Sequence, residues 1–292
     1  MSEAQLRIAH LILVHKSPAQ VERLIRALDH PQADYFIHLD KKASYEHFAG
    51  LASMRGVHFI RKRVDVGWGC YSLVQAELNG LEEIVATNRY DYINVLSGQD
   101  FPLRGAEEIY RFFLENRGDE FISCEPYSTD HAWWQEALPR VRKYNFQNWK
   151  IPGKYRIQFL VNRLMPDRRY PLDHELAGRS QWMSITVDSA RYLLQFLKEH
   201  PEVVRYFKYV WGADEFIFST ILYNSPFRKN IRDNLMYTDW SRGEPNPKLL
   251  TTEDFPLLQQ TNKIFARKFD MEADAHIFTL LEDWTKANQQ NR

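Results

Sequence analysis

Cysteine is scarce in this chain. Only Cys70 and Cys124 occur among its 292 residues. Two thiols are too few for a disulfide framework, and their separation does not match the spacing of metal-ligating cysteine pairs. We therefore expect free thiols in a reducing compartment, and the sequence predicts a cytoplasmic protein.

Long apolar runs and an excess of one charge are also missing. No segment approaches the roughly 18 apolar residues of a transmembrane helix, and residues 1–5 lack the basic flank and apolar run of a signal peptide. The 38 Lys and Arg side chains balance 38 Asp and Glu side chains, so no overall field attracts nucleic acid. We expect no nucleic-acid partner and no transmembrane segment, and peripheral membrane association stays open.

Several common catalytic motifs are absent as well. The chain contains no GxGxxG, no P-loop, no HExxH and no serine nucleophile elbow. Dinucleotide redox chemistry, Walker-type hydrolysis, zinc proteolysis and serine hydrolysis therefore lose their usual support.

What the chain does contain is a regular alternation of apolar strands and amphipathic helices. Strands are expected over 7–14, 35–40, 57–60, 92–96 and 120–124, with helices over 19–28, 45–54, 72–86 and 106–116. This order predicts an α/β fold with a mostly parallel, Rossmann-like central sheet flanked by helices. Polar loops after such strands line the crevice where nucleotides bind, which places His15, Asp40 and the basic cluster 61–63 at one rim.

The regular alternation lapses after residue 125. Residues 126–179 are dense in Trp, Tyr, Arg and Pro, with one amphipathic helix expected near 155–164. Such side chains either hold sugar rings or staple a loop-rich lobe onto the core, and both interpretations stay open. We expect a single domain over 1–292, made of a nucleotide-binding half (6–125), an insertion lobe (126–179) and a catalytic and acceptor half (180–292).

In that last part, two carboxylates stand at a predicted helix start. Gly212 is a plausible break in secondary structure, and Asp214 is a candidate N-cap. Apolar residues then recur at helical spacing from Ile217 to Leu222. In one interpretation, Asp214 caps the helix and Glu215 complements its dipole. In the other, these carboxylates take part in catalysis. Elements are also expected over 182–187, 189–199, 201–207, 235–237, 264–270 and 273–286.

Blocks spread along nearly the whole chain carry a family resemblance. The most distinctive is 96–103 (LSGQDFPL), and the others are 11–15, 37–40, Trp68 with 72–76, 180–182, 214–216, 239–240 and 265–269. In order and spacing the chain resembles the core-2/I-branching β-1,6-N-acetylglucosaminyltransferases and peptide O-xylosyltransferases.

The resemblance implies a GT-A fold, a UDP-sugar donor, a carbohydrate or glycosylated acceptor, and inverting transfer without a divalent metal or other cofactor. The chain has no Asp-x-Asp, the usual metal-binding motif of metal-dependent GT-A enzymes. By family position, Glu215 is the general base, and Lys268 with Arg267 meets the charge of the leaving diphosphate. The remaining donor residues are Val14, His15, Asp40, Arg63 and Asp100, and the sugar or acceptor residues are Trp68, Gln181, Trp182, Asp214 and Trp240.

One departure from the family pattern leaves alternatives open. The branching enzymes have a further diphosphate Arg, and the equivalent residues 243–248 contain none, so Arg242 or Lys248 are the available substitutes. GlcNAc is the favoured donor sugar, and UDP-xylose is the alternative. A sugar- or nucleotide-binding module without catalysis, and a metal-dependent phosphate-ester hydrolase using Asp40 and Asp100, are the rival functions.

Overall fold

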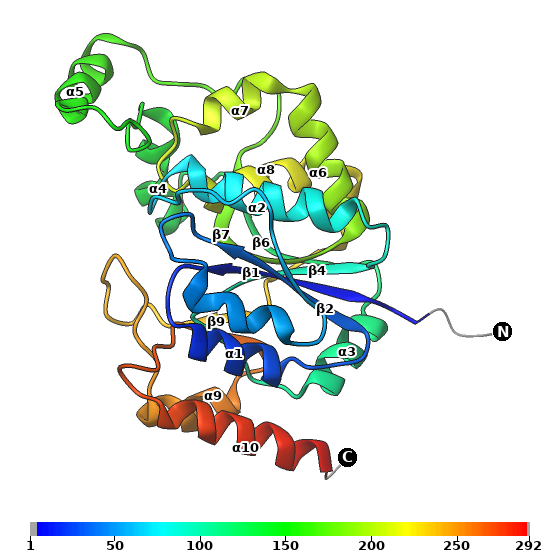
Figure 1. The fold of residues 1–292 in the computed structure, drawn as a ribbon. Helices are drawn as coiled ribbons and strands as arrows, with labels where there is room; N and C mark the ends of the chain where they lie inside the picture. Colours follow the sequence, from blue (N-terminus) through cyan, green and yellow to red (C-terminus); the bar gives the residue numbers. More distant parts are fainter. Residues whose placement is uncertain (1–4, 291–292) are drawn as a thin grey trace.

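A seven-stranded sheet forms the centre of the computed structural model, which describes residues 5–290 (Figure 1). The strand order is β3-β2-β1-β4-β7-β6-β8, and β7 alone runs antiparallel to its neighbours. The α/β class with a mostly parallel sheet, predicted from the alternation, is therefore confirmed. The strands are β1 Ile8–Val14, β2 Ala33–Leu39, β3 Val57–Phe59, β4 Tyr92–Ser97, β6 Glu120–Pro126, β7 Ala177–Thr186 and β8 Ile231–Arg232.

Helices cover both faces of this sheet (Figure 1). One face carries α1 (Pro18–Ala27), α3 (Ala106–Glu115), α9 (Phe255–Gln260) and α10 (His276–Gln290). The other carries α2 (Tyr71–Val85), α6 (Val187–Glu199), α7 (Pro201–Phe207) and α8 (Ile217–Tyr223). Strand β1 is buried along its whole length, as expected for a strand between two helical layers.

A second, three-stranded sheet joins the last part of the chain to the end of β4. It has the order β5-β10-β9, with β5 at Asp100–Pro102, β10 at Phe265–Arg267 and β9 at Met236–Thr238. The sequence predicts no strand over residues 97–103, because so short a strand pairs only with segments distant in sequence. Its pairing with β10 brings the basic residues 267 and 268 beside the central sheet. Short 3-10 helices complete the fold: η1 Glu46–Ser53, η2 Ala213–Glu215, η3 Pro226–Asn230 and η4 Thr252–Asp254.

The irregular lobe contains two helices, α4 (Ala132–Arg142) and α5 (Lys154–Leu164). Sequence periodicity anticipated α5 but not α4, because Pro139 lies inside α4 and proline usually ends a helix. Burial of Trp134, Ala137 and Val141 on one face of α4 overrides that preference. Strand β7 begins at Ala177, earlier than the predicted start at residue 182.

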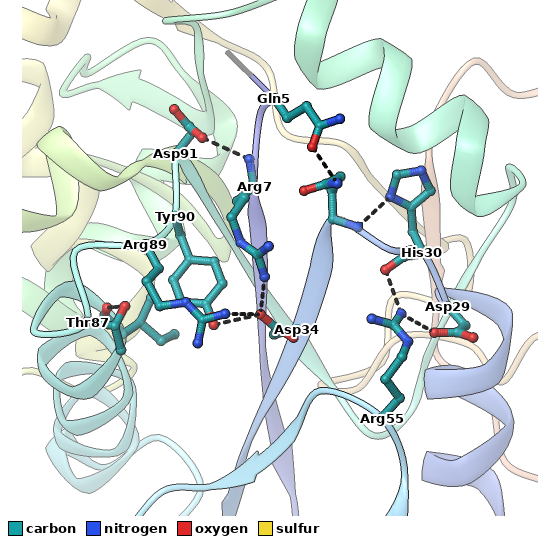
Figure 2. A network of polar contacts seen from close by, with 12 residues as sticks. Gln5, Arg7, Asp29, His30, Asp34, Arg55, Thr87, Arg89, Tyr90 and Asp91 are labelled. Atoms are coloured by element: carbon teal, nitrogen blue, oxygen red, sulfur yellow. Dashed lines mark hydrogen bonds and ion pairs between the residues drawn. The ribbon is translucent and has the colours of Figure 1, made fainter. Parts of the chain in front are cut away.

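Ion pairs join the amino ends of β1 and β2 (Figure 2). The Arg7 guanidinium pairs with Asp34 at 2.7 Å, and the Tyr90 hydroxyl donates to the same carboxylate at 2.8 Å. The backbone N–H of Arg7 donates to Asp91 at 2.8 Å. Burial and Asp34 raise the pKa of the Tyr90 hydroxyl, which keeps it a donor. This network ties the strand starts together at the edge opposite the polar rim.

No helix in the described range 5–290 is long and apolar enough to cross a membrane.

Candidate active site

Polar side chains gather at the carboxyl ends of β1 and β2. The backbone N–H of Asp40 donates to the carbonyl of Val14 at 2.7 Å, which joins the two strand ends. The buried Asp40 carboxylate accepts the N–H of Lys42 at 2.9 Å. His15 lies at the same rim, and partial burial with the charges of Lys16 and Lys268 lowers its pKa. The structure thus brings the predicted donor residues of the first two strands into one rim.

Arg63 fastens the loop that follows β2. Its guanidinium donates to the carbonyls of Leu39, Asp40 and Ala43 at 2.9, 2.7 and 2.5 Å. These three bonds tie the end of β2 to the loop that follows it. Arg63 is therefore held within hydrogen-bond distance of the Asp40 backbone.

Arg267 leads into the predicted diphosphate turn. Its Nε lies 3.2 Å from the Asp100 carboxylate, and its guanidinium lies 4.3 Å from the centre of the Trp182 ring. Asp100 is fully buried and also accepts the Ser97 N–H at 2.7 Å and the Ser97 hydroxyl at 2.6 Å. Burial raises the pKa of Asp100, and Arg267 opposes that rise. Asp100 and Trp182 therefore hold Arg267 in place, and the structure gives no support to Asp100 as a hydrolase metal ligand.

Lys268 is half-buried beside other cations. Its Nζ makes no hydrogen bond or ion pair within residues 5–290, whereas neighbouring Lys16 pairs with Asp270 at 2.6 Å. Burial, Arg267 and Lys16 lower the pKa of Lys268. A partly desolvated, unpaired ammonium next to like charge is unfavourable until an anion approaches. Lys268 is therefore available to pair with an anion.

Glu215 pairs with an arginine of the insertion lobe. Arg140 of α4 lies 2.9 Å from the Glu215 carboxylate, and the two side chains are 18% and 29% exposed. The Arg140 guanidinium also donates to the Trp211 carbonyl at 3.1 Å and packs on the rings of Trp211 and Phe216. Burial raises the pKa of Glu215, and Arg140 counteracts that rise. The Glu215 side chain is therefore held by Arg140 and stays partly exposed.

Two glycines allow the Glu215 turn to form. Gly212 has φ +64°, and a Cβ there would collide with the Arg140 guanidinium. A Cβ on Gly178 would lie 2.7 Å from the Glu215 carbonyl. Helix α8 begins only at Ile217, and the Asp214 side chain caps no helix. The predicted cap at Asp214 was therefore wrong, because the 3-10 turn η2 comes before the helix.

Two further carboxyl groups are buried behind this turn. Glu77 of α2 is fully buried, and its Oε1 accepts the Gln181 amide at 3.0 Å. Burial and Asp214 raise the pKa of Glu77 well above its usual value, and burial and Glu215 raise that of Asp214. Glu77 Oε2 and Asp214 Oδ1 have no partner among the described residues. The raised pKa values favour the neutral form of both carboxyls, which limits the negative charge buried beside Glu215.

Strand β7 links the two groups of residues. Because β7 is antiparallel, its first residues lie at the carboxyl ends of β4 and β6, the edge that also carries His15 and Asp40. Two adjacent residues of β7 make these contacts. The Gln181 amide donates to Glu77, and the Trp182 ring packs against the Arg267 guanidinium. The positive charge of Arg267 opposes the rise in the pKa of Asp214, which burial and Glu215 cause. The general-base candidate and the basic turn therefore belong to one edge of the sheet.

Two exposed tryptophans complete the predicted set. Trp68 is 59% exposed and meets Trp211 edge-to-face at 5.0 Å, next to the Glu215 turn. Trp240 is 56% exposed in the loop after β9. Exposed rings of this size can stack on sugars. The roles of both as sugar platforms stay predictions.

Sequence reasoning missed Arg140 and Glu77. Arg140 lies in the irregular lobe, where no spacing connects it to Glu215. Glu77 directly follows the block 72–76, and an acid among the apolar positions of α2 was a readable signal of a buried carboxyl. Of the two substitutes for the missing diphosphate arginine, Lys248 pairs with Asp254 at 2.6 Å, and Arg242 is exposed.

Comparisons with known proteins agree with the resemblance. The chain is 25% identical over 304 positions to xylosyltransferase 2 of Canis lupus familiaris, covering 95% of this chain and 33% of that protein. It is 25% identical over 308 positions to xylosyltransferase oxt of Drosophila melanogaster, covering 96% and 33%. The chain thus spans about a third of the length of these relatives.

Among solved structures, core-mannan synthase A of Aspergillus fumigatus aligns with a TM-score of 0.42 at 11% identity, over 80% of this chain and 74% of that one. Residues 8–260, well over half of the chain, match the family model described as Core-2/I-Branching enzyme. The chain therefore belongs to the Core-2/I-branching enzyme family of glycosyltransferases.

Proposed function

We propose that this chain is an inverting, metal-independent UDP-sugar glycosyltransferase with Glu215 as its general base. The observation that carries the proposal is the pairing of two features at one sheet edge. One is Glu215, whose side chain is partly exposed and whose pKa is raised. The other is the half-buried Lys268, which pairs with no anion within residues 5–290. The carboxylate can accept the proton of an acceptor hydroxyl, and the lysine can stabilise the negative charge of a departing diphosphate.

The proposed reaction is a single displacement. The Glu215 carboxylate takes the proton of the acceptor hydroxyl as that oxygen bonds to the anomeric carbon of the donor. The bond between this carbon and the diphosphate oxygen breaks on the opposite face, so the configuration inverts and UDP leaves. One base and one leaving-group clamp are sufficient for this chemistry, and no second carboxylate nucleophile is required.

In the proposed clamp, Lys268 and Arg267 replace a metal ion. Asp100 and Trp182 fix the guanidinium of Arg267, and the Lys268 ammonium stays unpaired to contact the diphosphate. Fixed cations of this kind stabilise developing charge without needing to reorganise during the reaction. Family membership supports the same metal-independent assignment.

Two UDP-sugars are candidate donors. UDP-GlcNAc follows from the likeness to the branching enzymes, and UDP-xylose is favoured by the names of the relatives. The alternative of a binding module without catalysis is disfavoured by the Arg140 pair, which holds Glu215 in a defined position at the turn.

A transfer assay tests the function. The purified chain is incubated with UDP-GlcNAc, UDP-xylose and other UDP-sugars, a panel of glycan and glycopeptide acceptors, and EDTA, and products are read by mass spectrometry. We expect one UDP-sugar to give product despite the chelator. A strict Mn²⁺ requirement would overturn the metal-free clamp, and UDP-sugar binding in thermal shift without transfer to any acceptor would favour the binding module.

Arg140 is expected to tune the base. Because an opposite charge within a few ångströms lowers the pKa of an acid, Arg140→Gln should raise the pKa of Glu215. The acid limb of the kcat/KM profile should then move up by about one pH unit, with activity largely recovered at high pH. The matched control is Arg142→Gln, an exposed position two residues further along α4. An unshifted profile would remove Arg140 from the site.

A further inference from the structure

Helix α5 presents the largest group of exposed apolar side chains on the described molecule. None of its residues is buried. More than half of the large apolar side chains exposed among residues 5–290 lie between residues 151 and 165. On the helix itself, Tyr155, Phe159, Leu160 and Leu164 are 58%, 63%, 54% and 79% exposed. An apolar group of this kind on a polar surface marks an interaction site.

The amphipathicity of α5 is inverted relative to a normal surface helix. Its polar side chains face the protein: Gln158 accepts the Phe146 N–H at 2.8 Å, and Asn162 bonds both the N–H and the carbonyl of Tyr144 at 2.7 and 2.9 Å. The opposite face carries Ile157, Leu160 and Leu164 at helical spacing. The fold thus holds the helix by its polar side and turns its apolar side outward.

Basic residues accompany the exposed apolar face. Within residues 143–169 there are seven Lys and Arg and one acid, Asp167, although the whole chain has equal numbers of both charges. Lys143 pairs with that acid, and Lys150 pairs with Asp65. Arg156, Arg163 and Arg169 are exposed. An apolar face beside exposed arginines complements a surface that is both apolar and anionic.

The position of α5 suits a broad, flat partner. The helix lies at the tip of the insertion lobe, projecting away from both sheets (Figure 1). Because α5 projects from the molecule and none of its residues is buried, its side chains can enter the headgroup region of a bilayer.

We propose that α5 is an interfacial membrane-binding helix that docks this enzyme on anionic lipid. Leu160, Leu164 and their apolar neighbours enter the interface, and Arg156 and Arg163 meet lipid phosphates. Insertion stays shallow, because a helix of 11 residues cannot span a bilayer. The proposal does not depend on the identity of the sugar or on transfer itself.

Vesicle co-sedimentation tests this docking. The purified chain is spun with phosphatidylcholine vesicles and with vesicles of equal parts phosphatidylcholine and phosphatidylglycerol, with neither UDP nor a sugar present. We expect binding to the anionic vesicles that weakens as NaCl is added. Equal binding to both vesicle types, or binding to neither, would overturn the proposal.

Two variants separate the apolar and the charged contributions. Leu160→Ser with Leu164→Ser should weaken binding about tenfold for each leucine, and Arg156→Gln with Arg163→Gln about fivefold for each arginine. The matched controls are Leu114→Ser with Leu257→Ser, at exposed positions of α3 and α9, and Lys198→Gln with Arg205→Gln on α6 and α7. Melting temperatures confirm that each variant folds.

Competing occupants give distinct results. A wild-type dimer in sedimentation velocity that the leucine variant abolishes would show that a second copy covers α5, and it would overturn the membrane proposal. Undiminished vesicle binding by both α5 variants would overturn it as well.

Discussion

Glu215→Gln is expected to abolish most transfer while leaving UDP binding intact. The substitution keeps the size of the side chain and removes its ability to accept a proton, and a positioned general base contributes about a hundredfold to ten-thousandfold to a rate. We therefore expect kcat to fall by about that factor. The Kd for UDP, measured by calorimetry, should change little, because Glu215 acts on the acceptor side.

The pH profile gives an independent test of the same residue. Burial raises the pKa of Glu215, so the carboxylate is the form lost as the pH falls through that value. The wild-type kcat/KM should consequently rise with pH along a limb of unit slope and then level off. The Glu215→Gln enzyme should lack this limb. Wild-type turnover by Glu215→Gln would exclude Glu215 as the base.

The control for this experiment is Glu136→Gln. Glu136 is exposed on α4, in the lobe that supplies Arg140, and the change removes the same charge. We expect it to retain wild-type transfer. A similar loss in both variants would indicate damage to the lobe and not loss of a base.

Lys268→Ala is the second change with a large expected effect. The hydrogen bond of an ammonium to a phosphate contributes about 1.5–3 kcal/mol, so the Kd for UDP should rise by about tenfold to a hundredfold. The leaving diphosphate gains charge in the transition state, and kcat/KM should therefore fall further than UDP affinity. Calorimetry and initial rates measure the two quantities separately.

The stability of the unliganded Lys268→Ala protein tests whether the charge of Lys268 is unfavourable before UDP binds. Burial, Arg267 and Lys16 all disfavour the charged form of Lys268 in the free protein, as its lowered pKa indicates. Removing that charge should raise the melting temperature without UDP and reduce the further rise on adding UDP. Lys198→Ala, an exposed lysine on α6, should do neither. Unchanged UDP affinity in Lys268→Ala would contradict the clamp.

The lobe contributes to the candidate site in a way that its composition did not reveal. Its aromatic and arginine content was compatible with sugar binding and with structural stapling. Arg168 packs on the rings of Tyr144 and Tyr206 and donates to backbone carbonyls, so it has a structural role in anchoring the lobe. Arg140 instead reaches Glu215. The same residue type therefore serves both purposes within one segment.

Local patterns were sufficient for the longer strands and helices, but not for β5, α4 or α9. Strand β1, helix α2 and helix α6 begin within two residues of their expected starts, because each carries an uninterrupted period of apolar residues that only one kind of element can bury. The rim formed by His15 and Asp40 followed from the same pattern, since the carboxyl ends of parallel strands meet at one edge.

The sequence by itself determined the α/β class, the family, and the residue types that a metal-free transfer needs. Only the tertiary structure decided which charges are paired. Asp100 neutralises Arg267, Arg140 holds Glu215, and Lys268 is left without a partner within residues 5–290. These contacts join residues as far apart as 167 positions along the chain. Periodicity reports only on neighbours in sequence, whereas the strength of a charge depends on burial and on neighbours in space.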